Sequence, residues 1–485
     1  MDTKKLRQKI LDLAIHGKLV PQDPNDEPAS VLLERIRAEK ERLIKEEKIK
    51  RSRKSAKTSD TPHYPQDVPF EVPEGWAWVT IGKLCSFLSR GKSPKYSEER
   101  KYPVFAQKCN LYDGDISLEQ ARFLDPETIS KWSDEYKLID GDILVNSTGT
   151  GTVGRTRLFH SDILGDYPFV VPDSHVSVVR TLEEIESKFV LAFLSSDYGQ
   201  TYIEDNLAGS TNQKELYIGI LENMQFPLPP HEEQLRIVTA VDKWFALIDT
   251  IDQGKANLQI AIKQTKSKIL DLAIHGKLVP QDPNDEPGSE LLKRINPKAQ
   301  ITCDNEHSRK LPYNWCLCNL GDVCMLENGF AFSSDQYKAK GTPLIRISNI
   351  KDNEISLSSC VFINEGYEEK YIVHSGDLLI AMSGATTGKM GIYNQKYVAY
   401  LNQRVGNIKI VDSNLLFDKY RNYFLFSQKN KILELAYGGA QPNISGKVIN
   451  SLFVPLPPIA EQKRIVQKIE KMFFILDDIQ NALEV

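Results

Sequence analysis

The stretch "KILDLAIHGKLVPQDPNDEP" occupies residues Lys9 to Pro28, and the same twenty letters return without a change from Lys268 to Pro287. An identical segment of this length indicates that the chain holds two versions of a larger unit. Each copy contains "AIHG", in which the glycine is typical of a helix C-terminus. His16 and His275 then fall in the last helical turn, where a histidine interacts favourably with the helix dipole, so we assign them a structural role.

Other segments also occur twice, so the repeat extends along nearly the whole chain. The matched pairs are "FPLPPHEEQLRIV" at Phe226 to Val238 with "FVPLPPIAEQKRIV" at Phe453 to Val466, "VPEGWAWVTIGKLC" at Val72 to Cys85 with "LPYNWCLCNLGDVC" at Leu311 to Cys324, and "IDGDILV" at Ile139 with "HSGDLLI" at His374.

The two ends of the chain meet within this repeat. At a displacement of 228 residues the last residue, Val485, corresponds to Asn257, and at a displacement of 259 the first residue, Met1, corresponds to Ile260. Two positions lie between these counterparts. The sequence therefore predicts a cyclic, pseudo-twofold repeat, in which the helix that runs unbroken through the middle of the chain is present again as two pieces, one from each terminus.

Apolar residues recur at spacings of three and four after each double proline, which is typical of a coiled-coil or bundle seam. Residues 232–274 would form a helix of roughly 60 Å, and so long a helix needs a partner along its length. We expect that partner to be the composite second helix, related by the pseudo-twofold axis and therefore antiparallel. The seam residues are Val238, Val241, Phe245 and Ile248 in one copy and Val466, Ile469, Phe473 and Leu476 in the other.

Two globular regions separate the helices and are rich in glycine, proline and aromatic residues, with short apolar runs between turns. We predict an α+β protein in which two mixed α/β units are separated by long antiparallel coiled-coil helices. Their frameworks agree while their polar positions differ, which indicates one scaffold that reads two different things. The predicted parts are an N-terminal helical segment 1–60 that completes the distal helical region, a globular unit 61–230, a central helical region 231–300, a second globular unit 301–458 and a distal helix 459–485.

The charge balance argues against a strongly basic nucleic-acid binder, because 61 Lys and Arg face 65 Asp and Glu for a net charge of -4. Any contact with DNA would rest on local patches or on basic partners. The polar start of the chain and the lack of a long apolar run predict neither a signal peptide nor a membrane span. We therefore expect a cytoplasmic protein with no membrane partner.

Neither the cysteines nor the glycine-rich stretches predict a metal or nucleotide site. Cys303, Cys316, Cys318 and Cys324 lack the paired spacing of zinc knuckles. "GTGTVG" at Gly149 is not followed by a helical pattern, so the helix N-terminus that would hold a pyrophosphate is missing. "GATTGKM" at Gly384 falls one residue short of a phosphate loop. We interpret both stretches as one shared glycine-rich turn.

No catalytic residue is predicted. Pro172, Asp173, Glu186 and Lys188 can be aligned with a nuclease-like acidic pattern, but the second unit lacks it. An Asn or Asp followed by Pro-Pro and an aromatic residue, as in adenine methyltransferases, does not occur. We therefore expect a non-catalytic protein that holds no metal and no cofactor of its own.

The arrangement resembles the specificity subunit of type I restriction-modification systems, the HsdS family. The resemblance covers the whole chain. It rests on two globular units alternating with two helical segments, on the paired "PLPP", "EQ" and "RIV" junctions, on "GDIL" and "GDLL" within the units, and on "NGFAF" followed by "GTPLIRISNI" in the second unit. One departure is that Val31 to Lys50 continues as a charged helix, whereas its counterpart stops at Pro297.

The resemblance implies a DNA-binding subunit of a DNA methylation and restriction complex. Each globular unit would be a target recognition domain that reads one half of an asymmetric, bipartite site in double-stranded DNA. The helices would dock two modification subunits, which resemble adenine methyltransferases and carry the S-adenosylmethionine. Restriction subunits, which add ATP-driven translocation and cleavage, would complete the complex, so this chain would direct adenine methylation and restriction without a cofactor.

Candidate DNA-binding residues are polar side chains at matched turns, because Lys and Arg position a protein on phosphates while Asn, Gln and Arg discriminate bases. For the basic run "KIKRSRKSAK" at Lys48 to Lys57, contact with the DNA backbone and a flexible linker both stay open. The candidates are Arg90, Lys92, Lys95, Gln107, Lys108, Asn110, Arg155, Asn212 and Lys214 in the first unit, and Asn328, Arg346, Asn349, Lys389, Gln403, Arg404, Gln441 and Asn443 in the second.

The alternative is a scaffold or interaction protein that is built on the same helical rod and does not bind DNA. The mild acidity of the chain favours this alternative slightly. Filter binding with random duplex, with and without a methyltransferase partner, would separate the two functions.

Overall fold

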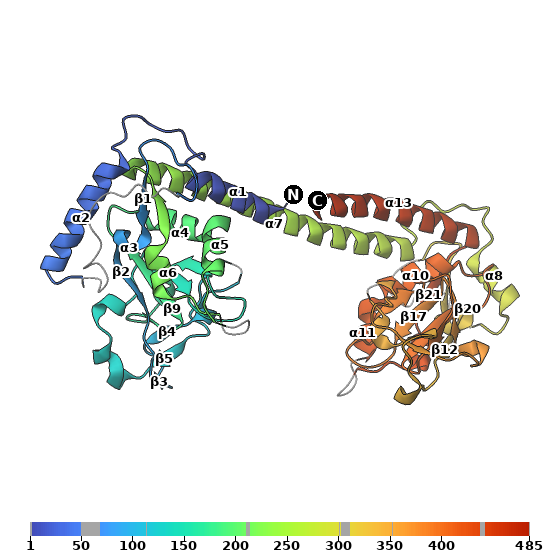
Figure 1. The fold of residues 1–485 in the computed structure, drawn as a ribbon. Helices are drawn as coiled ribbons and strands as arrows, with labels where there is room; N and C mark the ends of the chain where they lie inside the picture. The colour runs from blue at the N-terminus through green and yellow to red at the C-terminus, as the bar shows by residue number, and fades with distance from the viewer. Residues whose placement is uncertain are drawn as a thin grey trace. The chain divides into compact units, whose positions relative to one another are not determined.

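The computed structural model describes residues 2–49, 68–112, 114–209, 214–299, 301, 311–351, 353–436 and 442–484. The chain divides into two compact units, Met1–Gly254 and Lys255–Val485 (Figure 1). Each unit combines helices with a globular region of several sheets, so the predicted α+β class with two mixed units is confirmed.

Within its described residues, the globular region of unit 1 contains two four-stranded sheets and a two-stranded ribbon. The antiparallel ribbon pairs β1 (Ala77–Thr80) with β10 (Gln225–Leu228), so the two ends of the region lie together. One sheet has the order β2-β9-β6-β7 and the other β3-β5-β4-β8, in which β4 and β8 run parallel. The strands are β2 (Cys85–Arg90), β3 (Tyr96–Ser97), β4 (Pro103–Phe105), β5 (Arg122–Leu124), β6 (Ile143–Asn146), β7 (Thr156–Leu158), β8 (Val171–Pro172) and β9 (Val176–Thr181); the helices are α3 (Ile81–Leu84), α4 (Ser187–Ser195), α5 (Asp197–Asp205) and α6 (Ile218–Asn223); the 3-10 turns are η2 (Gln107–Cys109), η3 (Pro126–Lys131), η4 (Asp134–Tyr136) and η5 (Ser161–Leu164).

Unit 2 repeats this plan with one additional strand. The ribbon pairs β11 (Cys316–Asn319) with β21 (Phe453–Leu456), and the sheets have the orders β12-β20-β17-β18-β14 and β15-β13-β19-β16. The strands are β12 (Cys324–Asn328), β13 (Thr342–Ile345), β14 (Asn353–Glu354), β15 (Val361–Ile363), β16 (Ile372–Val373), β17 (Leu378–Ala381), β18 (Met390–Ile392), β19 (Ala399–Leu401) and β20 (Val405–Ile410); the helices are α9 (Leu320–Val323), α10 (Asp418–Ser427), α11 (Lys429–Ala436) and α12 (Gly446–Asn450); the 3-10 turns are η6 (Ser334–Gln336), η7 (Ile347–Asn349) and η8 (Glu369–Tyr371).

Helix α7 (His231–Ile274) is continuous over 44 residues and begins directly after the double proline. Its first part packs beside α1 (Thr3–Ile15) in unit 1, and its last part packs beside α13 (Ile459–Glu484) in unit 2 (Figure 1). The predicted long helix and its two helical partners are therefore present.

The paired helices are antiparallel within each unit. In unit 1, Arg7 is ion-paired with Asp249, while Gln22, in the loop after α1, donates to Glu233 over 2.7 Å. Residue numbers therefore rise along one partner as they fall along the other. The equivalent contacts in unit 2 are an ion pair between Lys266 and Asp477 and a hydrogen bond from Gln281 to Glu461 over 3.0 Å.

The predicted seam faces inward in both units. Val241 and Ile248 are buried in unit 1, and Val466 and Ile469 are buried in unit 2. In each unit these side chains belong to one apolar cluster that continues into the globular region. Because burial of such a side chain contributes about 1.5–3 kcal/mol, the helices and the globular region of a unit stabilise each other.

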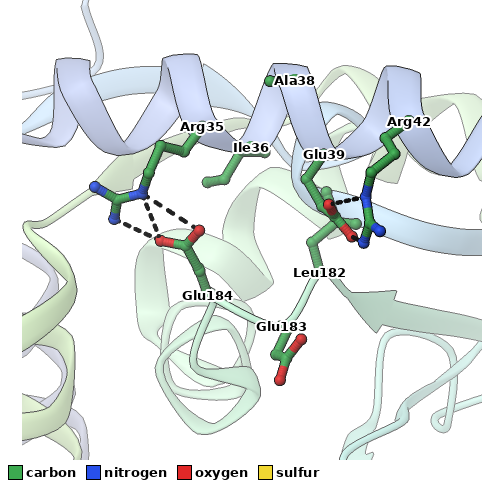
Figure 2. A pocket seen from close by; sticks show the side chains of 8 residues that line it. All are labelled: Arg35, Ile36, Ala38, Glu39, Arg42, Leu182, Glu183 and Glu184. Carbon is green, nitrogen blue, oxygen red and sulfur yellow. Dashed lines mark hydrogen bonds and ion pairs between the residues drawn. The ribbon is translucent and has the colours of Figure 1, made fainter.

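Helix α2 (Ala29–Lys45) is about twice as long as its counterpart α8 (Gly288–Ile295), as predicted. A hollow of about 430 Å³ lies between α2 and residues 182–184. Figure 2 shows two of its lining pairs, Arg35 hydrogen-bonded to Glu184 and Arg42 to Glu39. The helix ends earlier than Lys50 because Glu47 adopts a left-handed φ of 56°, which closes the last turn. Residues 50–57 of the basic run lie outside the described residues.

The cysteines are mostly structural side chains. Cys316 and Cys318 are buried in β11 and Cys324 at the start of β12, and desolvation raises the pKa of the Cys324 thiol to about 12. Cys303 lies outside the described residues. Across the described ranges, no three His, Cys, Asp or Glu side chains are grouped as metal ligands would be. No described helix combines the length and apolarity that crossing a bilayer requires.

Candidate nucleic-acid interface

A glycine-rich turn stands at the same place in both globular regions. In unit 1 it follows β6 and has positive φ at Gly149 (109°), Gly151 (72°) and Gly154 (82°). In unit 2 it follows β17 and has positive φ at Gly384 (83°) and Gly388 (80°). Each turn leads into a strand, β7 or β18, and not into a helix. The interpretation of both stretches as one shared turn is therefore confirmed.

Three further segments surround this turn in unit 1. The 3-10 turn η2 lines a hollow together with the glycine-rich turn. The main-chain N–H of Ser147 donates to the carbonyl of His175 over 2.8 Å, and the N–H of Leu216 donates to the carbonyl of Ser147 over 2.8 Å. Equivalent segments are neighbours in unit 2, where the N–H of Met382 donates to the carbonyl of Arg404 over 2.9 Å and the N–H of Gly384 donates to the carbonyl of Pro442 over 3.1 Å. We call each set the loop face of its unit: residues 107–112, 148–155, 173–175 and 214–216 in unit 1, and 347–351, 383–389, 402–404 and 442–444 in unit 2.

Four of the predicted DNA-binding residues meet on the loop face of unit 1. Gln107, Lys108, Asn110 and Arg155 line one hollow of about 270 Å³. They come from η2 and from the end of the glycine-rich turn, which are separated by more than forty residues in the sequence. The other lining residues are Leu111, Tyr112, Gly149, Thr150 and Thr152.

A chain of hydrogen bonds holds this hollow in shape. Asn110 is buried and donates to Asn146 Oδ1 over 2.7 Å, and Asn146 donates to the carbonyl of Gln107 over 3.1 Å. Arg155 donates to the carbonyl of Asn110 over 2.6 Å. Asn110 is therefore a framework residue of the hollow, whereas Lys108 is exposed at its rim.

Tyr112 and His175 are two side chains of the loop face that the sequence did not single out. Tyr112 is 83% exposed, and its ring lies 5.6 Å from the Arg155 guanidinium. His175 shares a hydrogen bond of 2.8 Å with Thr148. An exposed aromatic ring beside Lys and Arg offers a flat surface on which an unpaired base can stack. Because Tyr112 lies close to the candidate Asn110 in the sequence, it could have been predicted to lie on the same surface.

The remaining candidates of unit 1 lie outside the hollow. Arg90 is ion-paired with Glu215, which anchors the segment 214–216. Lys92 donates to the carbonyl of Lys131 over 2.8 Å and lies 4.0 Å from the Tyr136 ring centre. The last two described candidates carry ion pairs at the surface, Lys95 with Asp125 at 2.8 Å and Lys214 with Glu204 at 4.0 Å. Asn212 lies outside the described residues.

Of the described unit 2 candidates, five lie on the loop face, namely Asn349, Lys389, Gln403, Arg404 and Asn443, and they differ in exposure. Asn349 is fully buried. Its side-chain amide accepts from the Arg346 N–H over 2.9 Å and donates to the Ser356 carbonyl over 3.0 Å, and these bonds stabilise the conformation of η7. Arg346 itself lies 5.6 Å from the Tyr337 ring. Lys389 is half-buried at the end of the glycine-rich turn, and the exposed candidates are Asn328, Gln403, Arg404 and Asn443. Gln441 lies outside the described residues.

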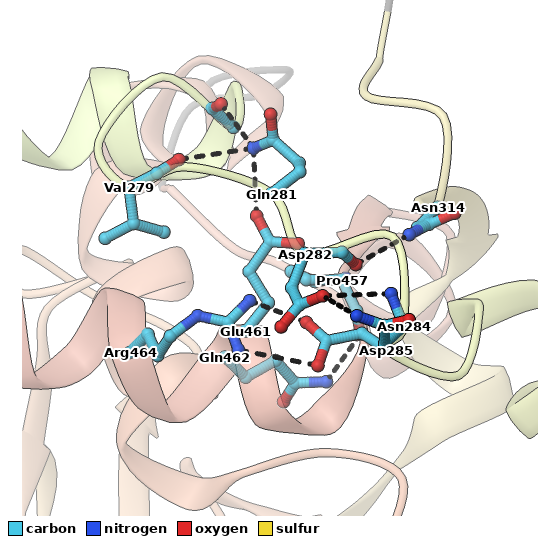
Figure 3. Close-up of polar contacts among 11 residues, drawn as sticks. Val279, Gln281, Asp282, Asn284, Asp285, Asn314, Pro457, Glu461, Gln462 and Arg464 are labelled. Atoms are coloured by element: carbon cyan, nitrogen blue, oxygen red, sulfur yellow. Dashed lines mark hydrogen bonds and ion pairs between the residues drawn. The ribbon is translucent and has the colours of Figure 1, made fainter.

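A buried carboxylate fastens the start of each long helix to its globular region. In unit 1, Trp76 Nε1 donates to Glu233 over 2.9 Å, and Arg236 contacts Asp26 over 2.5 Å. Figure 3 shows the equivalent junction of unit 2, where Gln281 reaches Glu461 and Arg464 contacts Asp285 over 2.6 Å. Desolvation raises the pKa of both Glu233 and Glu461.

Apolar side chains remain exposed along the helices of both units. In unit 1, Trp244 is 46% exposed and Leu247 is 49% exposed on α7. In unit 2, Phe474 is 74% exposed and Ile475 is 51% exposed on α13, where Ile475 is the repeat counterpart of Leu247.

Comparison with known proteins gives one consistent family. The family described as "Type I restriction modification DNA specificity domain" matches residues 73–260 and 312–485. The specificity subunit of the type I restriction enzyme EcoAI from Escherichia coli is 30% identical, over 97% of this chain and 88% of that protein. The EcoEI specificity subunit, also from Escherichia coli, is 27% identical over 99% of this chain and 91% of that protein.

Solved structures agree on the fold. A chain from a structure titled as the basis of assembly and conformational transition of the type I R-M system aligns with a TM-score of 0.59 at 18% identity, over 86% of this chain and 94% of that chain. The HsdS subunit from Thermoanaerobacter tengcongensis aligns with a TM-score of 0.50 at 19% identity, over 86% and 92%. With two matched domains, a relative similar over nearly its full length and the same fold, this chain belongs to the family of type I restriction-modification DNA specificity subunits.

Proposed function

We propose that each globular region is a target recognition domain that reads one half of an asymmetric, bipartite site in double-stranded DNA. The observation that carries this proposal is the loop face. Two regions of one framework present different polar side chains at equivalent turns, with Gln107, Lys108 and Arg155 in unit 1 and Lys389, Gln403 and Arg404 in unit 2. A shared scaffold with unlike readers suits a target whose two halves differ.

The helices would dock two modification subunits, and restriction subunits would complete the complex. The exposed apolar residues of α7 and α13, at partly equivalent positions of the repeat, support two related docking surfaces. In this proposal residues 61–230 and 301–458 are the recognition domains, while 1–60, 231–300 and 459–485 are the helical parts. The chain itself would be non-catalytic, with S-adenosylmethionine and ATP held by its partners. It would direct adenine methylation and restriction to the site.

The test is a domain exchange in the complex with the modification subunits. Replacing the region between Pro69 and Pro229 by a foreign recognition domain is expected to change one half of the methylated sequence and preserve the other, because the β1–β10 ribbon closes that region on itself. Methylation mapping of host DNA reads both halves at once. A chimera that assembles with its partners and still methylates the original complete site would contradict the proposal.

Filter binding separates this function from the alternative scaffold. We expect the complex with modification subunits to retain specific duplex in preference to random duplex, with an affinity that falls as salt rises. A complex that binds neither duplex would favour a scaffold without a DNA role.

A further inference from the structure

One position of the loop face carries opposite chemistry in the two units. The first residue of the 3-10 turn is Gln107 in η2 and Ile347 in η7, and each turn follows its strand, β4 or β13, after one intervening residue. A Cβ placed on Gly149 would lie 2.3 Å from Gln107 Oε1, and one placed on Gly384 would lie 3.4 Å from Ile347 Cδ1. Both side chains therefore lie beside the first glycine of the turn, Gln107 closely and Ile347 less so. The framework is shared, and the side chain is polar in one unit and apolar in the other.

The Gln107 side chain has an unused acceptor. Its Oε1 is buried and has no hydrogen-bond partner within the described residues, although the side chain lines an open hollow. The Oδ1 of Asn110, which lines the same hollow, likewise has no partner among the described residues, whereas the buried Asn349 has both amide atoms bonded. The terminal torsion of glutamine is broad, so the amide oxygen can turn from beneath Gly149 into the hollow. An N–H donor placed in the hollow would then satisfy it.

We propose that Gln107 and Ile347 are specificity-determining residues for one base pair in each half-site, an inference that rests on the proposed function. Gln107 reads adenine, because its amide offers an acceptor for the N6 amino group and a donor for N7. Ile347 is half-buried against the apolar cluster of its region, and at the position equivalent to Gln107 it reads thymine, because an aliphatic side chain contacts the C5-methyl group and offers no hydrogen bond to the other bases.

Lys108 has a different task and supplies the control. It is exposed at the rim of the same hollow. A lysine at such a rim neutralises phosphates and carries no sequence information. Its removal weakens binding to all duplexes alike, whereas a change at Gln107 alters the order in which duplexes are preferred.

The experiment uses the full complex of this chain with its modification subunits. The wild-type target is mapped by methylation sequencing, and binding is measured to a panel of duplexes with each base pair of the target substituted in turn. Gln107→Glu is expected to shift one pair of half-site 1 from A·T to C·G by about 10- to 100-fold, since a carboxylate accepts from the cytosine amino group. Ile347→Gln is expected to shift one pair of half-site 2 from T·A toward A·T. Lys108→Ala lowers affinity for every duplex by a similar factor.

Gln107→Leu removes the hydrogen-bonding groups of this side chain and keeps a similar volume, so a change in recognition can be separated from a loss of folding. This variant is expected to remove discrimination at the same base pair and leave half-site 2 unchanged, while size-exclusion chromatography checks assembly of the complex. The inference is overturned if the preferences of both half-sites are unchanged in Gln107→Glu and Ile347→Gln, or if these variants weaken all duplexes uniformly as Lys108→Ala does. A wild-type complex without any sequence preference would instead overturn the proposed function.

Discussion

The carboxylate of Glu233 is shared between Trp76, whose Nε1 donates over 2.9 Å, and Gln22, whose amide donates over 2.7 Å. Three segments distant in the sequence meet there: the duplicated stretch, the first strand region of the globular part and the start of α7. The carboxylate of Glu461 accepts from Gln281 in the same way in unit 2, over 3.0 Å. The twenty duplicated residues thus supply the loop that clamps the start of each long helix.

Removing this carboxylate should weaken unit 1. Glu233 is 1% exposed, so Glu233→Ala leaves the Trp76 and Gln22 donors without their acceptor. Each buried donor left unpaired costs about 1–3 kcal/mol, and we expect a loss of about 3 kcal/mol in the free energy of unfolding. Urea denaturation of wild type and Glu233→Ala measures this loss in the free energy of unfolding. The exposed neighbour Glu232 is the control, because its replacement by alanine should change stability by less than about 0.5 kcal/mol.

The same carboxylate should make stability depend on pH. Desolvation raises the pKa of Glu233 above its ordinary value of 4.5, so the folded state binds this proton more tightly than the unfolded state does. Its contribution to stability is then greatest below about pH 4.5 and falls as pH rises through the raised pKa. Glu233→Gln stays neutral at every pH. We expect the stability of wild type relative to Glu233→Gln to decline across this window in urea titrations, and a difference independent of pH would refute the assignment.

The ion pairs at the starts of the two long helices should have similar coupling energies. Arg236 and Asp26 approach to 2.5 Å in unit 1, and Arg464 and Asp285 approach to 2.6 Å in unit 2, with each aspartate largely buried and each arginine about one-third exposed. Double-mutant cycles with alanine should give a coupling of about 1 kcal/mol for each pair, reduced by salt. Couplings that differ by more than about 1 kcal/mol would show that the repeat does not preserve this contact energetically.

The glycine-rich turn of unit 1 should tolerate alanine at one glycine and not at another. Both Gly149 and Gly151 have positive φ, which costs alanine about 1–2 kcal/mol. A Cβ at Gly149 would also lie 2.3 Å from Gln107 Oε1 and from Thr152 Oγ1, whereas a Cβ at Gly151 meets nothing within 4 Å. Both oxygens are side-chain ends that can move aside, so Gly149→Ala should displace the Gln107 amide at little extra cost in stability and lower DNA affinity more than Gly151→Ala does. Equal effects would mean that Gln107 is not held against this turn.

Salt dependence should reveal the phosphate contact of Lys108. In the complex with modification subunits, Lys108→Ala should reduce the slope of log affinity against log salt by about one. Lys131→Ala is the control, because this residue lies on η3, away from the hollow. Equal slopes for wild type and Lys108→Ala would exclude the contact.

The sequence by itself determined the plan of this protein. The cyclic repeat follows from sequence identity between segments. The long helix and its seam follow from the spacing of apolar residues, because helix formation depends mainly on residues close together in the chain. Val241, Ile248, Val466 and Ile469 are buried as their periodicity predicted. The family followed from the order of the repeated motifs, which is also carried by the chain alone.

Tertiary structure alone decided which polar residues share a surface. Gln107 and Arg155 meet because β4 and β6 lie in sheets whose loops converge, and no local pattern encodes that pairing of distant strands. Asn110 and Asn349 look like surface amides in the sequence but are buried, since each closes hydrogen bonds to groups that folding brings to it. Tyr112 is exposed although aromatic residues usually add to a core. Burial and exposure of a single side chain depend on contacts far along the chain, and these are settled when the sheets form.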